Sequence, residues 1–354
     1  MNSDIFIICI SLLVLFVLVC KDFFVSKQLY PSVTVESFFS KSQTDWLRGI
    51  AIILIMYSHY YAVLNLNGKI NGILYQLLSC TGMYGVALFL LMSGYATMIS
   101  KMNKTNYLQG YIPKRLLRLY VPFIIVFIIM VILRMVHGEG ITLKNILLMP
   151  LMSLPDTINW YLKVQLALYI VFYLAARFIK KDKWVIIAIF TICFVYMIIG
   201  LITHIDAYWY ESSYMFPLGM LMAKYKNSVF RFLSLHYPIK IIASFLLAAI
   251  FYIPYYFFGG PIPEIIHIWG ITQFMVCLCV KMRGTSRILS FFGQCSLELY
   301  LSHAIYLGYI RQYFNLQENV LTYLLFMASS VLFAYVVKKI SNLFIRYINR
   351  KSHC

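Results

Sequence analysis

The chain has 354 residues, of which 62% are hydrophobic and only 12% are charged. A soluble domain carries about 25% charged residues and could not bury so large an apolar fraction, so these values exclude a soluble globular protein. The net charge of +18 does not indicate a nucleic-acid partner, because the basic residues stand between long apolar runs. The composition therefore predicts an integral membrane protein in contact with the anionic leaflet of a lipid bilayer.

The first apolar run, 5–20, is predicted to be a retained transmembrane helix. Asp4 precedes this run, Lys21 follows it, and no pair of small residues marks a cleavage site. A secretory signal peptide has basic residues before its apolar core. Residues 1–40 are therefore interpreted as a helix with its cytoplasmic connection, and 41–354 as the functional membrane domain.

Eleven apolar runs are interpreted as membrane spans. Their ranges are 5–20, 46–64, 78–99, 117–136, 158–179, 184–203, 212–223, 239–258, 264–281, 289–311 and 320–343. The odd-numbered connections are rich in Lys and Arg, whereas the even-numbered ones are poor in them or mixed. Under the positive-inside rule, this alternation predicts an all-α, polytopic transmembrane helical bundle of about 11 spans, with its N-terminus outside and its C-terminus in the cytoplasm.

The second run, TDWLRGIAIILIMYSHYY, places Arg48 and His59 eleven residues apart. Three helical turns separate them, so both project from one face, about 16 Å apart along the axis. Arg48 lies at the cytoplasmic end and His59 near mid-membrane, where a functional role is the default hypothesis for an ionisable residue. The structural alternatives are a histidine hydrogen-bonded between helices and an arginine that reaches the interface. Asp45 is expected to cap this helix, with pairing to Arg48 as the alternative.

Arg115 and Arg118, in PKRLLRLYVP, share one helix face at the cytoplasmic start of the fourth run. Two guanidinium groups there could hold phosphates bidentately, such as the diphosphate and the ribose phosphate of coenzyme A. An ordinary positive-inside cluster is the alternative interpretation.

The run FFGQCSLELYLSHAIYL places Ser296, Glu298, Tyr300 and His303 within two turns. A glutamate inside a span needs a partner, and the three arginines named above are the candidates on the same side of the membrane. Glu298 therefore has either a structural role, in an ion pair between helices, or a catalytic or coenzyme-contacting one.

These segments, taken together, resemble the acyltransferase-3 family of integral membrane acyltransferases. DWLRGIAIILIMYSHYY resembles the opening signature of that family, a basic residue followed after ten others by His, which Arg48 and His59 match. VALFLLMSGY, KRLLRLYVP, NWYLKVQLALY and SLELYLSH resemble later segments of the family in the same order. The resemblance runs from Asp45 to about residue 345; Glu298 departs from it, standing where many members have an apolar or small residue.

The resemblance implies a ten-span core, to which the first helix is an addition, and transfer of an acyl group, most often acetyl, from acyl-CoA to a hydroxyl of a cell-surface or lipid-linked carbohydrate. His59, Arg48 and Glu298 are expected to be catalytic, and Arg115, Arg118 and Arg48 to bind acetyl-CoA. No metal is expected, because the cysteines lack the spacing of zinc ligands. The expected location is the bacterial plasma membrane, and homo-oligomerisation is left open.

The hypothetical mechanism makes His59 either a general base or a transiently acylated nucleophile. Ser58, Ser93 or Tyr95 would stabilise the oxyanion. An outer vestibule would take the sugar, with aromatic side chains and two carboxylates. The candidates for this vestibule are Trp160, Tyr208, Trp209, Tyr210, Asp206 and Glu211.

A membrane transporter is the alternative from another class, because an intramembrane relay of Arg, His and Glu also builds solute pathways. The chain shows no pair of matched interrupted helices in two halves, which are the usual mark of an inverted repeat. A non-catalytic assembly protein of a polysaccharide pathway is the third hypothesis.

Overall fold

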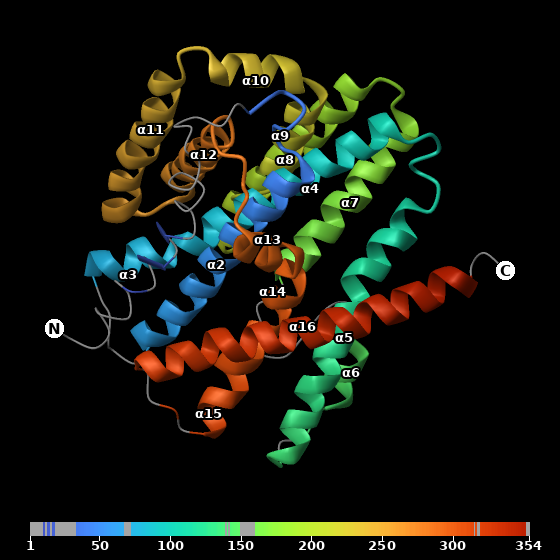
Figure 1. The fold of residues 1–354 in the computed structure, drawn as a ribbon, viewed down its shortest axis with the longest axis vertical. Helices are drawn as coiled ribbons and strands as arrows, with labels where there is room; N and C mark the ends of the chain where they lie inside the picture. The colour runs from blue at the N-terminus through green and yellow to red at the C-terminus, as the bar shows by residue number, and fades with distance from the viewer. Residues whose placement is uncertain are drawn as a thin grey trace.

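The computed structural model describes residues 10, 13–14, 16–17, 33–66, 72–138, 140, 142–148, 160–314, 316 and 319–351. Over these ranges the chain forms helices joined by turns and contains no β-strand, as Figure 1 shows. The predicted all-α class is therefore confirmed. The predicted helix 5–20 lies largely outside the described residues, so the boundary at residue 40 stays a prediction.

The described elements are helices that follow one another along the chain. They are α2 (Lys41–Leu66), α3 (Gly72–Ser79), α4 (Thr81–Asn103), α5 (Tyr111–Val136), α6 (Leu143–Leu148), α7 (Trp160–Phe178), α8 (Asp182–Ile202), η2 (Ala207–Trp209), α9 (Met215–Lys224), α10 (Lys226–Ser234), α11 (Tyr237–Phe258), α12 (Pro261–Leu278), α13 (Arg287–Gln294), α14 (Ser296–Ile305), the π-helical η3 (Tyr306–Ile310), α15 (Arg311–Tyr313) and α16 (Val320–Lys351).

Seven stretches of the described chain are long and apolar enough to cross a membrane. They are Gln76–Asn103, Tyr111–Val136, Trp160–Phe178, Asp182–Ile202, Tyr237–Phe258, Pro261–Leu278 and Val320–Ile348. The chain is thus a multi-pass helical membrane protein, but the predicted count of about 11 spans is not confirmed.

The predicted span 289–311 differs most clearly from the structure. It is divided among α13, α14, η3 and α15 instead of forming one helix. The backbone leaves the helical region at Cys295, where φ is −104° and ψ is 12°, so α14 can take a new direction after α13. Apolar composition alone does not reveal such a break, because the pieces together keep the length and apolar content of one span.

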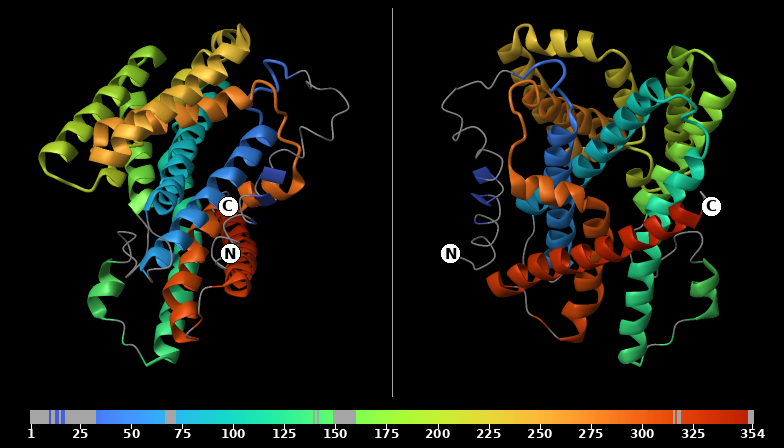
Figure 2. Two further views of the ribbon diagram at one scale, coloured as in Figure 1. Left: turned by 90° about the vertical axis from the view of Figure 1, so that its left-hand side faces the viewer. Right: turned by 45° about the vertical axis from the view of Figure 1, so that its right-hand side comes forward.

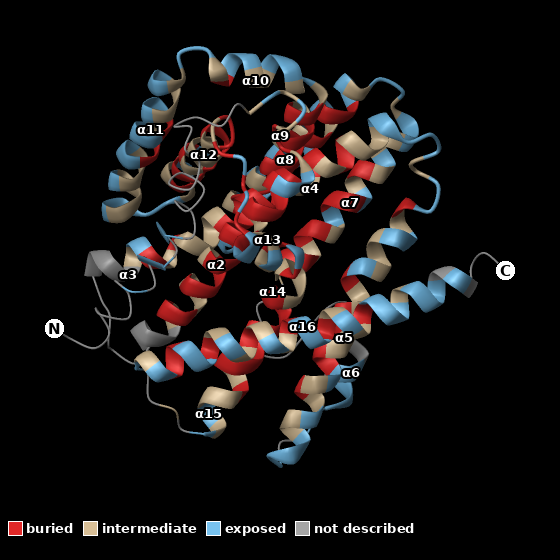
Figure 3. Ribbon diagram, in the orientation of Figure 1, coloured by how far each residue is buried: buried red, intermediate tan, exposed pale blue. Residues whose placement is uncertain are grey.

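The centre of the molecule is formed by α2, which packs against α4, α13 and α14, and by α4, which packs against α9. Figure 3 shows buried residues concentrated along α2, α4 and α9, whereas α10, α11 and the end of α16 are mostly exposed. α16 lies across α14 and α5, as seen in Figure 1 and Figure 2. Functional side chains on α2 are therefore surrounded by helices.

Two glycine contacts bring the central helices together. A Cβ built at Gly94 of α4 would overlap the carbonyl oxygen of Phe216 in α9, and one built at Gly219 of α9 would overlap that of Leu91 in α4. Small residues at such crossings allow the backbones to approach closely, which is how helices pack in a membrane. Gly49 of α2 and Gly293 of α13 allow the same close backbone contact where α2 crosses α13.

We predict that Gly219→Ala destabilises the protein by about 1–3 kcal/mol, because the new methyl group forces α4 and α9 apart. The midpoint of thermal unfolding in detergent measures the change. Gly308→Ala is the matched control, since a Cβ at Gly308 meets no atom within 4 Å. Equal melting temperatures for both variants would show that the α4–α9 crossing tolerates a wider separation.

Candidate functional site

A cavity of about 680 Å³ lies among α2, α4, α5, α7, α13, α14 and α16. Its size falls within the range of about 300–1,000 Å³ found for small-molecule sites. Arg48, Arg115, Arg118 and Glu298, which belong to three different helices, all line it. With Lys41, Lys338 and Asp45 it carries five cationic side chains and two carboxylates. This excess of positive charge favours an anionic ligand.

Arg115 is held rigidly at one side of this large cavity. Its Nη2 donates to the hydroxyls of Tyr107 at 3.1 Å and Thr97 at 3.3 Å. The guanidinium carbon lies 4.6 Å from the ring centroid of Tyr169 and 5.2 Å from that of Tyr111. These aromatic and hydroxyl contacts orient the cation before any ligand arrives. An ordinary positive-inside arginine would reach the membrane surface instead.

Arg118 makes no ion pair or hydrogen bond with any described residue, so its donors are open to a ligand in the cavity. Glu298 lines the same cavity but forms no ion pair with any of the three arginines over the described ranges. Its electrostatic neighbour is Lys338 of α16. The three arginines considered as candidate partners of Glu298 thus line the same cavity without forming an ion pair with it.

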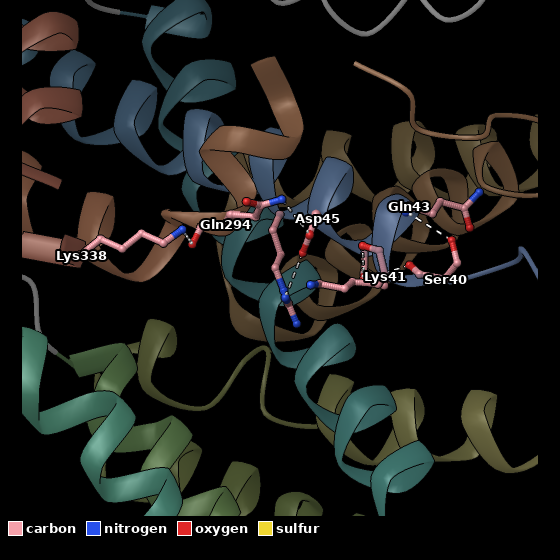
Figure 4. A network of polar contacts seen from close by, with 8 residues as sticks. Ser40, Lys41, Gln43, Asp45, Gln294 and Lys338 are labelled. Atoms are coloured by element: carbon pink, nitrogen blue, oxygen red, sulfur yellow. Dashed lines mark hydrogen bonds and ion pairs between the residues drawn. The ribbon is translucent and has the colours of Figure 1, made fainter. Parts of the chain in front are cut away.

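A polar network fixes the mouth of the large cavity (Figure 4). Asp45 lies 3.5 Å from Arg48 and accepts a hydrogen bond from Gln294 at 3.4 Å, and Lys338 donates to the Gln294 carbonyl at 2.7 Å. The network joins α2, α13 and α16. The expected capping role of Asp45 is wrong, because α2 already begins at Lys41, so Asp45 lies inside the helix and pairs with Arg48.

A chain of hydrogen bonds leads from Arg115 into the protein. The hydroxyls of Tyr169 and Ser93 are 2.9 Å apart, Gln165 Nε2 donates to Ser93 at 2.9 Å, and Tyr161 donates to Gln165 Oε1 at 3.1 Å. The ring of Tyr161 packs edge-on against that of Tyr300 at 5.4 Å. A line of polar side chains therefore runs along one wall of the large cavity, from Arg115 to Tyr300.

A second cavity of about 190 Å³ lies beyond Tyr300, which lines both cavities. Its polar and aromatic lining consists of Ser58, His59, Ser79, Trp160, Tyr208, Glu211 and Tyr300. Three of the candidates for an outer vestibule, Trp160, Tyr208 and Glu211, are in this lining, and the other three are not. His59 thus lines the small cavity, whereas the three arginines line the large one, and Tyr300 is common to both.

His59 is hydrogen-bonded to His303 of α14. The distance from His59 Nδ1 to His303 Nε2 is 2.6 Å, and the rings are stacked 4.9 Å apart at 10°. His303 is completely buried, and its Nδ1 lies 3.0 Å from the carbonyl oxygen of Leu299. Because a carbonyl oxygen only accepts, His303 Nδ1 carries a proton there.

The contact with Leu299 decides the tautomers of both rings when they are neutral. His303 Nε2 then has no proton and accepts from His59 Nδ1–H. His59 Nε2 is consequently unprotonated and has a lone pair to offer. The pair therefore fixes His59 in the tautomer that a general base at Nε2 requires.

Sequence reasoning noted His303 but did not connect it with His59. The two residues lie on different helices, and only the packing of α14 against α2 brings them together. Glu298 and His303 are five residues apart and diverge accordingly, one lining the large cavity and the other meeting His59.

The three candidates for oxyanion stabilisation are separated by the structure. Ser93 lines the large cavity, and Ser58 lines the small one while donating to the Ser79 carbonyl at 2.7 Å. Tyr95 lines neither cavity and packs against Phe39, with ring centroids 5.1 Å apart. Within the described residues, no group of three or more His, Cys, Asp and Glu side chains gathers as metal ligands would.

Residues 42–339 match a protein-family model described as an acyltransferase domain. The matched range contains the three arginines, Glu298 and the histidine pair, and it extends from α2 into α16. No match was found among curated proteins or among solved structures.

We predict that the large cavity binds pyrophosphate and that Arg118→Ala weakens this binding about tenfold or more, since a charge-assisted hydrogen bond contributes about 1.5–3 kcal/mol. The rise in melting temperature with pyrophosphate concentration measures the affinity. Lys104→Ala removes an exposed lysine that does not line the cavity and should bind as the wild type does. The same affinity for both variants would contradict a phosphate site at Arg118.

Proposed function

Because the chain belongs to the acyltransferase-3 family of membrane acyltransferases, we propose that it transfers an acyl group, acetyl in the first instance, from cytoplasmic acyl-CoA to a hydroxyl of a cell-surface or lipid-linked carbohydrate. The observation that supports this best is the meeting, at Tyr300, of a cation-lined cavity with a cavity that holds a histidine pair. A phosphorylated donor and a hydroxyl acceptor would approach each other from these two sides.

The donor side follows from the charges of the large cavity. Arg115 and Arg118 would hold phosphates of coenzyme A, and Arg48 would add a third cation near the mouth. Arg48 and His59 are separated by about 16 Å along α2, a span that an extended pantetheine arm can cover. The thioester carbonyl would then lie near Tyr300, within reach of the histidine pair.

The chemical step uses the lone pair on His59 Nε2. His59 takes the proton of the acceptor hydroxyl while the hydroxyl oxygen attacks the thioester carbonyl carbon. The carbon–sulfur bond then breaks, and the imidazolium returns the proton to the coenzyme A thiolate. His303 Nε2 accepts from His59 Nδ1–H throughout, which keeps the ring oriented and stabilises its positive charge.

The orientation in the membrane is part of the proposal. Arginines concentrate at the cytoplasmic end of spans, so the large cavity would open to the cytoplasm, where acyl-CoA is found. The proposed location is the bacterial plasma membrane, with the C-terminus in the cytoplasm and the N-terminus outside. The small cavity would then face the outer side, where surface carbohydrate is modified.

We predict that His59→Ala lowers acetyl transfer by about 10²–10⁴-fold, the usual contribution of a general base. Reconstituted protein with radiolabelled acetyl-CoA and added glycan provides the assay, and equilibrium binding of acetyl-CoA should stay as in the wild type. Label retained on wild-type protein after denaturation would indicate an acylated His59 instead of direct transfer. Wild-type protein that neither binds nor consumes acetyl-CoA would contradict the proposal and favour a transporter.

We predict that His303→Ala lowers kcat by about five- to tenfold, because one hydrogen bond of about 1–1.5 kcal/mol to His59 is lost. His303→Gln should recover part of this rate, since its amide oxygen can accept from His59 Nδ1–H. Acetyl-CoA binding should be unchanged in both variants. If His303 had a purely structural role, kcat of both the Ala and the Gln variant would fall together with the yield of folded protein.

A further inference from the structure

Glu211 and Glu264 form a buried carboxyl pair on one side of the small cavity. Glu211 follows η2 and is 1% exposed, and Glu264 lies in the first turn of α12 and is 7% exposed. The carboxyl group of Glu264 is an electrostatic neighbour of that of Glu211. Negative charges on neighbouring buried carboxyl groups repel each other, so this arrangement disfavours ionisation of both groups at once.

One oxygen of this pair is left without a partner. Glu211 Oε2 is fully buried and makes no hydrogen bond with any residue that the structure describes, although Glu211 lines the small cavity. A buried carboxyl oxygen without a donor is costly in a folded protein. A ligand in the cavity that donates a hydrogen bond to Glu211 would give this buried carboxyl group a partner. His59 lines the same cavity.

The remaining wall of the cavity is aromatic. The rings of Trp160 and Tyr208 lie 5.2 Å apart, and Tyr208 is 40% exposed, so the aromatic side reaches the surface of the protein. Lys163 Nζ lies 5.9 Å from the neighbouring ring of Trp209. This positive charge at the aromatic rim disfavours a cationic ligand. A neutral molecule with apolar C–H faces and hydroxyl donors fits the wall best.

We propose that Glu211 positions the acceptor: its carboxyl group accepts a hydrogen bond from a second hydroxyl of a neutral pyranose unit while His59 Nε2 receives the proton of the reacting hydroxyl. Trp160 and Tyr208 would pack against the sugar ring. A volume of about 190 Å³ restricts the site to a single sugar unit, with any longer glycan lying outside. The assignment rests on the proposed function and adds to it the residue that selects the acceptor.

The test uses the full chain in liposomes, radiolabelled acetyl-CoA, and methyl glycosides of glucose, galactose, mannose and N-acetylglucosamine. At least one glycoside should take label from the wild type. Glu211→Ala should raise KM for that glycoside about tenfold or more, with Glu211→Gln smaller in effect and acetyl-CoA binding unchanged in both. Glu36→Gln is the matched control, because Glu36 is exposed and lines neither cavity.

Glycosides that each lack one hydroxyl make the test specific to the proposed hydrogen bond. Removing one hydroxyl of the glycoside should raise the wild-type KM as much as Glu211→Ala does, and should have no further effect on that variant. A KM in Glu211→Ala equal to that of the wild type would overturn the role of Glu211. Acetyl-CoA binding without label on any glycoside would overturn the pyranose site. Absence of acetyl-CoA binding in the wild type would instead remove the proposed function itself.

Discussion

The hydrogen bond between His59 and His303 is the contact around which the candidate site is organised. It joins α2 to α14 beside the small cavity, and the Leu299 carbonyl sets the proton positions of both rings. A single histidine in this place could offer either nitrogen to a substrate. The second histidine removes that freedom, so the geometry of α14 decides which atom of His59 is basic.

The electrostatic character of the two cavities differs as strongly as their size. The large cavity collects cations from α2, α5 and α16, and a cage of tyrosines fixes Arg115 within it. The small cavity has Glu211 as its carboxyl group and aromatic rings as its walls. An anionic donor and a neutral acceptor would therefore be sorted to opposite sides of Tyr300, which keeps each ligand out of the other site.

Close packing of α2, α4, α9 and α13 makes such polar groups tolerable inside a membrane protein. Lipid gives helices no hydrophobic reason to associate, so backbone contact at glycines has to provide much of the attraction. Gly49 and Gly293 bring α2 against α13 next to Asp45, and the hydrogen bond of Gln294 to that carboxylate follows from this contact. Arg48 is held at the cavity mouth as a result.

The sequence by itself determined the membrane class, the helical fold and the family. These depend on composition, on the length of apolar runs and on the order of motifs, none of which requires knowledge of tertiary contacts. It also identified Arg48, Arg115 and Arg118 as cations at one end of their helices. The pairing of His59 with His303, the free oxygen of Glu211 and the division of 289–311 into short helices were decided only by tertiary structure. Each depends on which helix faces which, and residues far apart in the chain carry no periodic signal of that contact.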